Sequence, residues 1–268
     1  MTPRGIAITG ATGGIGRALV RAYAAPGVRF LLLGRDEAAL DTARDEAERS
    51  GAVAHTLSVP VTDHAAVAEA LARFDAETGI DLFLPAAGVK TGNRAGQEPP
   101  DQLDRVIAVN LTAVLHQVQA VLPGMLARRR GQIVLFGSLA AASPAADLLS
   151  YTATKSGITC YGVALRRALR GTGVTVHIVS PGFVDTPMTD RHGGRTPMMV
   201  SPDRAARTIR AGLSRGRARI SFPRSLFALV WLENLLPVAL ADRIDAAYRA
   251  EITPDPDEAA ATRDQSRG

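Results

Sequence analysis

A tyrosine and a lysine four residues apart, Tyr151 and Lys155 in the stretch SYTATKSG, could carry out proton chemistry. Positions i and i+4 lie on one face of a helix, so the phenol and the ammonium can point into the same cleft. A lone tyrosine has a pKa near ~10 and is a poor base at neutral pH, whereas a nearby positive charge favours its phenolate. Such a pair is also common on protein surfaces, so the rest of the chain must decide between the two interpretations.

A glycine-rich turn stands near the start of the chain. The stretch TGATGGIGRALV follows an expected strand, and Gly10, Gly14 and Gly16 have the spacing Gly-x-x-x-Gly-x-Gly. Glycines allow a sharp turn there and let backbone N–H groups approach a pyrophosphate at the positive end of a helix dipole. Between a strand and a helix, this motif predicts a dinucleotide site. A tight turn without a ligand is the alternative.

The end of the second expected strand bears on the choice of cofactor. The sequence there is FLLLGRDEAAL, with Arg35 and Asp36 at the place where dinucleotide folds contact the adenosine ribose. An arginine accommodates a 2′-phosphate, whereas an acid binds the ribose hydroxyls. Arg35 therefore predicts NADP. Asp36 leaves NAD open, although it reads more naturally as the N-cap of the next helix.

These motifs must be positioned by an α/β framework, because short β-branched or leucine-rich runs alternate with longer alanine-rich stretches. That alternation predicts βαβ units and a parallel sheet covered on both faces. The expected strands are 5–9, 29–33, 52–58, 81–85, 132–136, 174–179 and 218–222, and the expected helices lie near 14–25, 37–49, 63–77, 101–128, 150–170 and 202–214. We predict a dinucleotide-binding and catalytic domain over 1–222, an apolar helical C-terminal extension of it over 223–252, and a flexible tail over 253–268.

Composition narrows the class of protein. The net charge of the 268 residues is +5, arginine supplies nearly all of the positive charge, and the densest basic run is RRR at 128–130. The charge is otherwise spread among acids, so we expect an anionic cofactor rather than nucleic acid as the partner. The single cysteine, Cys160, permits no disulfide or cysteine metal site within the chain; we expect a buried thiol, no metal and a cytoplasmic location. Neither a signal-peptide layout nor an 18-residue apolar run is present.

With these motifs in place, the chain resembles the short-chain dehydrogenase/reductases, in their common single-domain branch, over roughly residues 4–222. The resemblance is carried by TGATGGIG at 9–16, Asn110 in VNLTAV, Ser138 in VLFGSLAA, YTATK at 151–155 and PGFVDTPM at 181–188, in the family's order and spacing. It implies a Rossmann-type doubly wound parallel sheet of about seven strands, with the cofactor along its carboxyl edge.

The resemblance also implies a role for each of these residues. Tyr151 would give its proton to a carbonyl oxygen while the nicotinamide delivers hydride, and Lys155 would favour the phenolate and bind the nicotinamide ribose. Ser138 would bind the substrate oxygen, and Asn110 would help to hold a water linked to Lys155; a surface asparagine is the alternative. The cofactor-binding residues implied are Gly10, Thr12, Gly14, Ile15, Gly16, Arg35, Gly88, Tyr151, Lys155, Pro181, Gly182, Val184 and Thr186.

Two features of the family are missing. The fourth strand ends in PAAG at 85–88 where the family usually has Asn-Asn-Ala-Gly, and Pro60 stands where an aspartate often binds the adenine amino group. Gly88 keeps the close backbone approach, and Asp63, shortly after Pro60, reads as the N-cap of the next helix. We expect weaker cofactor binding and a less stable sheet rather than a loss of chemistry, because the catalytic positions are all present.

Two segments around the expected cleft are less defined. The stretch 188–200, MTDRHGGRTPMMV, reads as a mobile substrate lid; we expect His192 there to be exposed, with a contact to the substrate as the alternative. The extension contains Trp231 and leaves three interpretations open: an apolar roof over the cleft, a subunit contact, or a peripheral membrane contact next to Arg219, Arg224 and Arg243. The first and third of these suit a hydrophobic substrate.

The sequence thus predicts an NADP-dependent oxidoreductase that interconverts a ketone or aldehyde and an alcohol, on a small hydrophobic substrate. Two alternatives remain open: a regulator that binds NADP without turnover, and a redox-neutral epimerisation or elimination that uses the tyrosine–lysine pair for proton transfer alone. The resemblance implies a homodimer or homotetramer through the long helices at 101–128 and 150–170.

Overall fold

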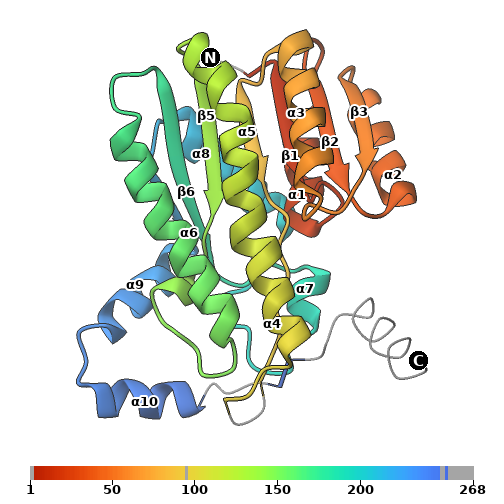
Figure 1. Ribbon diagram of the computed structural model, residues 1–268. Coiled ribbons are helices and arrows are strands. Elements are labelled where there is room, and N and C mark those ends of the chain that lie inside the picture. The colour runs from red at the N-terminus through yellow and green to blue at the C-terminus, as the bar shows by residue number, and fades with distance from the viewer. Residues whose placement is uncertain (1–2, 94–95, 248–250, 253–268) are drawn as a thin grey trace.

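The computed structural model describes residues 3–93, 96–247 and 251–252. Within these residues, seven parallel strands form one sheet in the order β3-β2-β1-β4-β5-β6-β7 (Figure 1). The strands are β1 (Gly5–Thr9), β2 (Arg29–Gly34), β3 (Val53–Ser58), β4 (Leu82–Pro85), β5 (Gly131–Phe136), β6 (Val174–Pro181) and β7 (Arg219–Phe222). The strand order reverses between β1 and β4, which makes their carboxyl ends the switch point where such sheets bind ligands. The predicted doubly wound fold is confirmed.

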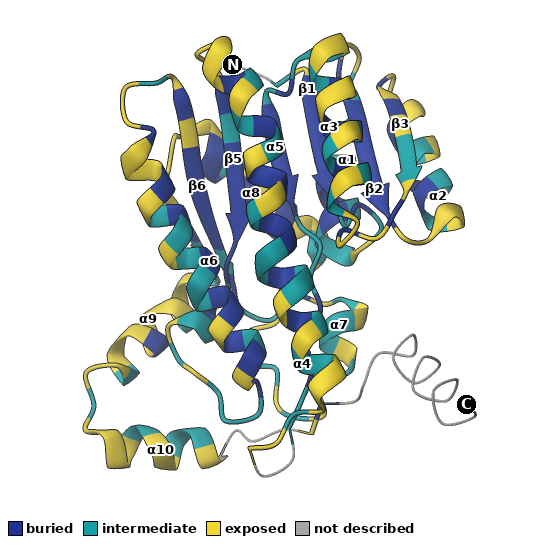
Figure 2. Ribbon diagram, viewed as in Figure 1, coloured by how far each residue is buried: buried dark blue, intermediate teal, exposed yellow. Residues whose placement is uncertain are grey.

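Helices cover both faces of the sheet. One layer holds α1 (Gly14–Tyr23), α2 (Glu37–Glu48) and α8 (Pro202–Ser214), and the other holds α3 (His64–Thr78), α5 (Ala113–Ala127) and α6 (Leu149–Ala168). Successive strand residues point to opposite faces, so Ile6 and Ile8 pack in the first layer while Ala7 packs in the second. Strands buried on both faces need continuous apolar runs, and Figure 2 shows the central strands almost wholly buried.

The bounds of the predicted elements are correct to within two residues, with one exception. The expected helix at 101–128 is divided into α4 (Pro100–Ile107), the π-helical turn η1 (Ala108–Thr112) and α5. In η1 the N–H of Ala113 donates to the carbonyl of Ala108, which adds one residue to the turn. Such turns occur often at functional sites. Here the turn contains Asn110.

Side-chain caps define where the helices around the sheet begin. Asp36 accepts a hydrogen bond from the N–H of Ala39 at the start of α2, and Asp63 does the same for Ala66 at the start of α3. Both N-cap predictions are confirmed. Ser201 caps α8 in the same way. These caps satisfy N–H groups that have no partner within the helix.

Four helices gather beyond the carboxyl edge of the sheet, at the lower end of Figure 1. They are α4, α7 (Pro187–Asp190), α9 (Arg224–Glu233) and α10 (Val238–Ala247). The helical stretch 100–127 is long and apolar enough to cross a membrane by composition alone. Its side chains Val114, Val118 and Val121 lie in the core against the sheet, which makes α5 a core helix.

The expectation of a buried Cys160 is wrong. Its thiol is exposed, because position 160 lies on the outward face of α6 together with exposed Ala164. The predicted flexible tail at 253–268 lies outside the described residues.

Candidate active site

The glycine-rich turn connects β1 to α1 and lies against the chain that follows β4, at the switch point. Gly10 has a positive φ of 69°, which glycine adopts without strain. A Cβ on Gly10 would stand 2.6 Å from the backbone of Ala87, directly after β4, and a Cβ on Gly16 would strike the carbonyl of Gly10. Glycine is therefore required at both positions by the close approach of the backbone.

The first turn of α1 has the features of an anion site. Gly13 precedes the helix, and within the described part of the chain no side chain caps it, in contrast to α2, α3 and α8. Its backbone N–H groups and positive dipole end are thus left for an anion such as a pyrophosphate. Ile15 packs against the core behind the turn. A Cβ on Gly14 would strike the methyl group of Thr186, so the loop after β6 lies directly against this turn.

The residues expected at the adenosine end also lie together. A Cβ on Gly34 would stand 3.1 Å from Cγ2 of Thr12, which places Thr12 beside the end of β2. Arg35 follows with an exposed side chain, and its backbone carbonyl accepts a hydrogen bond of 2.9 Å from Oγ of Ser58. The end of β3 thus holds the backbone at Arg35, directly after β2.

Tyr151 lies in the first turn of α6 and faces Ser138. The Glu98 carboxylate accepts hydrogen bonds from both N–H and Oγ of Ser150, which anchors the start of α6. A hydrogen bond joins the hydroxyls of Tyr151 and Ser138, and Oγ of Ser138 also accepts from N–H of Ala140 at 3.1 Å. Burial raises the pKa of Tyr151 above its ordinary value of 10.0, and the hydrogen bond from Ser138 opposes part of that rise.

Lys155 lies behind the tyrosine and is buried. Its Nζ donates a hydrogen bond of 3.1 Å to the carbonyl of Phe136, at the end of β5, and lies 5.7 Å from the centre of the Tyr151 ring. Burial lowers the pKa of Lys155 to about 8. Desolvation of the phenol dominates the pKa of Tyr151 here, and the expectation that the Lys155 ammonium favours the phenolate stays a prediction.

Asn110 is fully buried, so its interpretation as a surface residue is wrong. Its Oδ1 accepts from N–H of Val89 at 2.9 Å, and its Nδ2 donates to the carbonyl of Val89 at 2.8 Å and to Oγ1 of Thr154 at 3.3 Å. A Cβ on Gly88 would stand 3.4 Å from Oδ1 of Asn110 and 3.6 Å from Nζ of Lys155. Asn110 therefore fixes the chain after β4, where the asparagines usual in the family are missing, and brings it against Lys155.

The segment after β6 completes the arrangement. Pro181 ends β6, and N–H of Gly182 donates to the carbonyl of Phe222 at 2.7 Å. A Cβ on Gly182 would stand 2.7 Å from a methyl group of Leu226, so α9 packs against this turn. The structure thus brings Pro181 and Gly182 to the edge where the candidate residues lie.

The two ends of the loop that contains the expected lid pair with each other through backbone hydrogen bonds. Val184 pairs with Val200 in a parallel bridge, and the carbonyl of Val184 accepts from Oγ1 of Thr186 at 3.2 Å. The loop between them contains α7 and His192, whose ring lies 5.3 Å from that of Phe183. His192 is partly buried rather than exposed, because this contact covers one side of it. Mobility of the loop stays a prediction.

Sequence reasoning did not identify Lys90, which lies two residues after Gly88 and is buried. Burial, and secondly the nearby Arg191, lower its pKa to about 8, while Asp190 acts in the opposite direction. One signal could have found it: Lys90 and Lys155 are the only lysines in a chain whose Lys+Arg total is 31.

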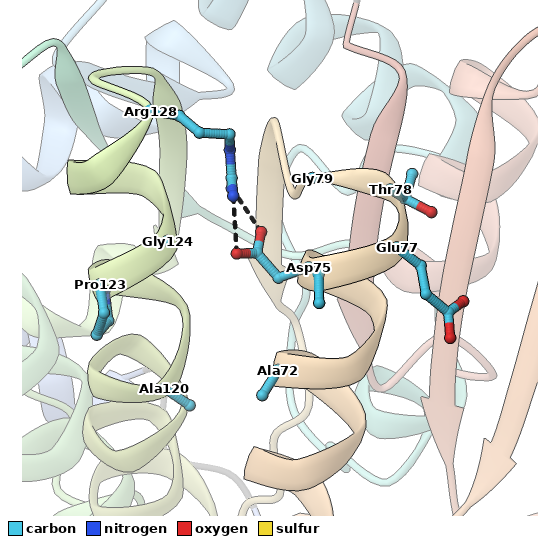
Figure 3. A pocket seen from close by; sticks show the side chains of 10 residues that line it. Ala72, Asp75, Glu77, Thr78, Gly79, Ala120, Pro123, Gly124 and Arg128 are labelled. Atoms are coloured by element: carbon cyan, nitrogen blue, oxygen red, sulfur yellow. Dashed lines mark hydrogen bonds and ion pairs between the residues drawn. The ribbon is translucent and has the colours of Figure 1, made fainter.

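A surface hollow of about 520 Å³ lies far from these residues. It is situated between the carboxyl ends of α3 and α5, at the opposite end of the sheet (Figure 3). Asp75 and Arg128 form an ion pair across it, and small residues such as Ala72 and Gly124 line it. Arg130 in the same basic run pairs with Asp81 at 2.6 Å.

Comparison with known proteins now identifies the family. The family model described as short chain dehydrogenase matches residues 4–195, which include the glycine turn, Asn110, Ser138, Tyr151 and Lys155. The chain belongs to the short-chain dehydrogenase/reductase family. The protein is therefore an oxidoreductase of this family.

Relatives and solved structures agree with this assignment. An uncharacterized oxidoreductase of Myxococcus xanthus is 34% identical over 90% of this chain and 96% of its own length. A 3-oxoacyl-(acyl-carrier-protein) reductase, FabG, of Escherichia coli is 31% identical over 68% of this chain and 74% of its own. A short-chain dehydrogenase of Sphingobium yanoikuyae in complex with NADPH is 26% identical, covers 91% of this chain and 92% of its own, and superposes with a TM-score of 0.76.

Proposed function

We propose that this short-chain dehydrogenase is an NADP-dependent oxidoreductase that interconverts a ketone or aldehyde and an alcohol. The observation that carries the proposal is the convergence of four side chains at the carboxyl edge. The Tyr151 hydroxyl is hydrogen-bonded to Ser138, Nζ of Lys155 lies 5.7 Å from the Tyr151 ring, and Gly88 brings Asn110 and Lys155 together. An acid, an oxygen-binding hydroxyl and a cation are then available around one reacting oxygen.

The residues present fit a dinucleotide. The uncapped start of α1 and the closely packed glycine turn would hold the pyrophosphate, and Lys155 the nicotinamide ribose. Arg35 would receive the 2′-phosphate. Asp36 already accepts a hydrogen bond as a helix cap, which supports NADP over NAD. When bound, the nicotinamide supplies or accepts the hydride.

Four side chains would take part in the transfer of the proton. At neutral pH the raised pKa keeps Tyr151 protonated, so in the reducing direction the phenol is ready to donate its proton to the carbonyl oxygen. Ser138 would bind the same oxygen and stabilise the charge that develops on it. The Lys155 ammonium would stabilise the phenolate that remains. Asn110 would help to hold a water through which Lys155 exchanges protons with solvent.

The position of the C-terminal extension supports an apolar substrate. Nδ2 of Asn234 donates to the carbonyl of Ala142 at 2.7 Å, and Glu233 accepts from Oγ of Ser143 at 2.8 Å. These contacts attach α9 to the loop that begins at Ser138. We propose that α9 and α10 form an apolar roof over the cleft, which suits a hydrophobic carbonyl compound.

The outer surface of the extension is apolar as well. Trp231 is 61% exposed, Leu235 62% and Val238 76%. A subunit contact in a homodimer or homotetramer and a peripheral membrane contact both remain predictions for this surface. Light scattering of the purified protein and flotation with anionic vesicles, each repeated with Trp231→Ser, separate the two.

Oxidation of NADPH and NADH against a panel of hydrophobic ketones and aldehydes tests the proposed function. We expect turnover with NADPH in preference to NADH and loss of turnover in Tyr151→Phe. Tyr161→Phe on the same helix serves as the matched control, since Tyr161 bonds to Gln119 away from the site. Cofactor binding without turnover of any carbonyl, unchanged by Tyr151→Phe, would instead indicate a regulator. Isotope exchange at carbon without net cofactor oxidation would indicate a redox-neutral proton transfer.

A further inference from the structure

The two lysines of this protein, Lys90 and Lys155, are both buried at the same edge of the sheet. Arginine supplies every other basic side chain among the 31 Lys and Arg residues of the chain. Lys90 and Lys155 are each only 7% exposed, and both lie at the carboxyl edge of the sheet. A lysine on a surface normally keeps its ammonium in water, so two deeply buried lysines in an arginine-rich chain call for a physical reason. Lys155 has one in the proposed mechanism, whereas Lys90 does not.

Lys90 lies in the loop after β4, two residues beyond the glycine that contacts Lys155. The loop after β4 runs beside the segment that contains α7: a Cβ on Gly88 would stand 3.9 Å from the methyl group of Met188. Two residues further along, the charges of Asp190 and Arg191 act on Lys90. Gly88 also lies against Lys155. The Lys90 ammonium therefore lies close to the expected lid, two residues along the chain from the contact of Gly88 with Lys155.

The charges of the described residues around Lys90 include no dominant negative partner for its ammonium. Among the described residues, the effect of the Arg191 cation on Lys90 exceeds that of the Asp190 carboxylate. The charges of Lys90 and Asp147 both act on His192, in opposite directions. Burial of an ammonium without a dominant negative partner is unfavourable. An anionic group on a ligand would supply the dominant negative partner that Lys90 does not have among the described residues.

We propose that Lys90 is a specificity-determining residue that binds a carboxylate on the substrate of this enzyme. The inference rests on the proposed function, since the substrate is the carbonyl or alcohol compound that Tyr151 would protonate or deprotonate. Two residues of chain span at most about 7 Å, so the backbone of Lys90 lies within that distance of Gly88, which contacts Lys155. A ligand that reaches both Tyr151 and Lys90 would therefore carry its carboxylate a few carbon atoms from the reacting carbon. A lysine suits this task because its ammonium is a compact charge on a flexible stem. The predicted substrate class is an oxo acid or hydroxy acid with an apolar body.

Ligand binding tests the inference without turnover. Isothermal titration calorimetry of the enzyme saturated with NADP compares hexanoate with hexanamide, which has the same apolar chain and no charge. We expect hexanoate to bind about 10-fold more tightly, as one charge-assisted hydrogen bond implies. Lys90→Met and Lys90→Gln should abolish this preference and leave the affinity for hexanamide unchanged, and Lys90→Arg should retain part of it. NADP affinity in each variant shows that the site is folded.

Arg195→Met is the matched control, since Arg195 is an exposed cation on the same loop. It should leave the preference intact. Equal binding of hexanoate and hexanamide to the unmodified enzyme, no measurable binding of hexanoate, or an unchanged preference in both Lys90→Met and Lys90→Gln would each overturn the inference.

Kinetics separate the failure of this inference from the failure of the proposed function. Reduction of 4-oxopentanoate and 5-oxohexanoate is compared with that of their methyl esters. We expect Lys90→Met to raise KM for the acids at least 10-fold and to leave KM for the esters within twofold. Reduction of the esters with no effect of Lys90→Met on the acids would overturn the role of Lys90 and leave the oxidoreductase activity standing. Tighter binding of the carboxylate with no reduction of any carbonyl compound would overturn the oxidoreductase activity and leave the role of Lys90 standing.

Discussion

Replacement of Lys155 by methionine should stabilise the folded protein at pH 7 while it abolishes catalysis. Burial lowers the pKa of Lys155 from 10.5 to about 8. At about 1.36 kcal/mol per pH unit, this difference means that the charged form destabilises the folded state by about 3 kcal/mol. Methionine has nearly the same length and no charge. It loses the hydrogen bond to the Phe136 carbonyl, which costs about 1–2 kcal/mol. The expected net gain in the free energy of unfolding is about 1–2 kcal/mol.

The difference in stability between Lys155→Met and the unmodified enzyme changes sign as the pH rises. Below pH 8 the lysine is protonated in both the folded and the unfolded chain, so the full penalty is present. Between pH 8 and 10.5 the folded protein binds fewer protons than the unfolded chain, so the stability of the unmodified enzyme rises with pH. The advantage of the variant should therefore disappear by about pH 9.5, and the unmodified enzyme should become the more stable protein above it.

Urea unfolding of both proteins without cofactor, at pH 7, 8, 9 and 10, measures this difference. Arg166→Met, an exposed cation on the same helix, should show no such dependence on pH. If Lys155→Met is less stable at pH 7 and the difference stays constant up to pH 10, then burial does not govern the charge of Lys155 and the reasoning is refuted.

Three further predictions concern cofactor binding and the position of the chain after β4. Arg35→Ala should weaken NADP binding about 10-fold and leave NAD binding within twofold, as fluorescence titration would show; an equal loss for both would exclude recognition of the 2′-phosphate. Gly14→Ala should weaken NADP binding about 10-fold by its contact with the Thr186 methyl group, and the added change Thr186→Ser should restore part of the affinity; no restoration would mean that this contact is not the cause. Asn110→Ala leaves the buried N–H and carbonyl of Val89 unpaired and should lower the free energy of unfolding by about 2–4 kcal/mol; a loss below 1 kcal/mol would contradict the role of this side chain.

Much of the framework could be predicted because it follows from local sequence. Strands that are buried on both faces need unbroken apolar runs, and β1 and β2 have them. The caps Asp36 and Asp63 were recognisable because an aspartate before an alanine-rich helix has few other uses. The order and spacing of the family motifs located Ser138 and Tyr151 before any distance between them was known.

The remaining features depend on contacts between distant segments. The π-helical turn that buries Asn110 has no distinctive sequence, because it forms where the loop after β4 presents Val89 to the side chain. The direction of the Tyr151 pKa depends on how far packing desolvates the phenol, which spacing along a helix does not reveal. The burial of Lys90 likewise depends on a segment about one hundred residues away, although the scarcity of lysine was visible in the sequence.

The central claim is that the Tyr151 hydroxyl transfers the proton that accompanies hydride transfer. Single-turnover stopped-flow measurement of NADPH oxidation, on mixing the loaded enzyme with a carbonyl substrate found in the panel, tests it most directly. We predict that Tyr151→Phe slows this step by about 10²–10⁴-fold with NADPH affinity unchanged, which is the usual contribution of a general acid. Equal rates for the variant and the unmodified enzyme would contradict the account.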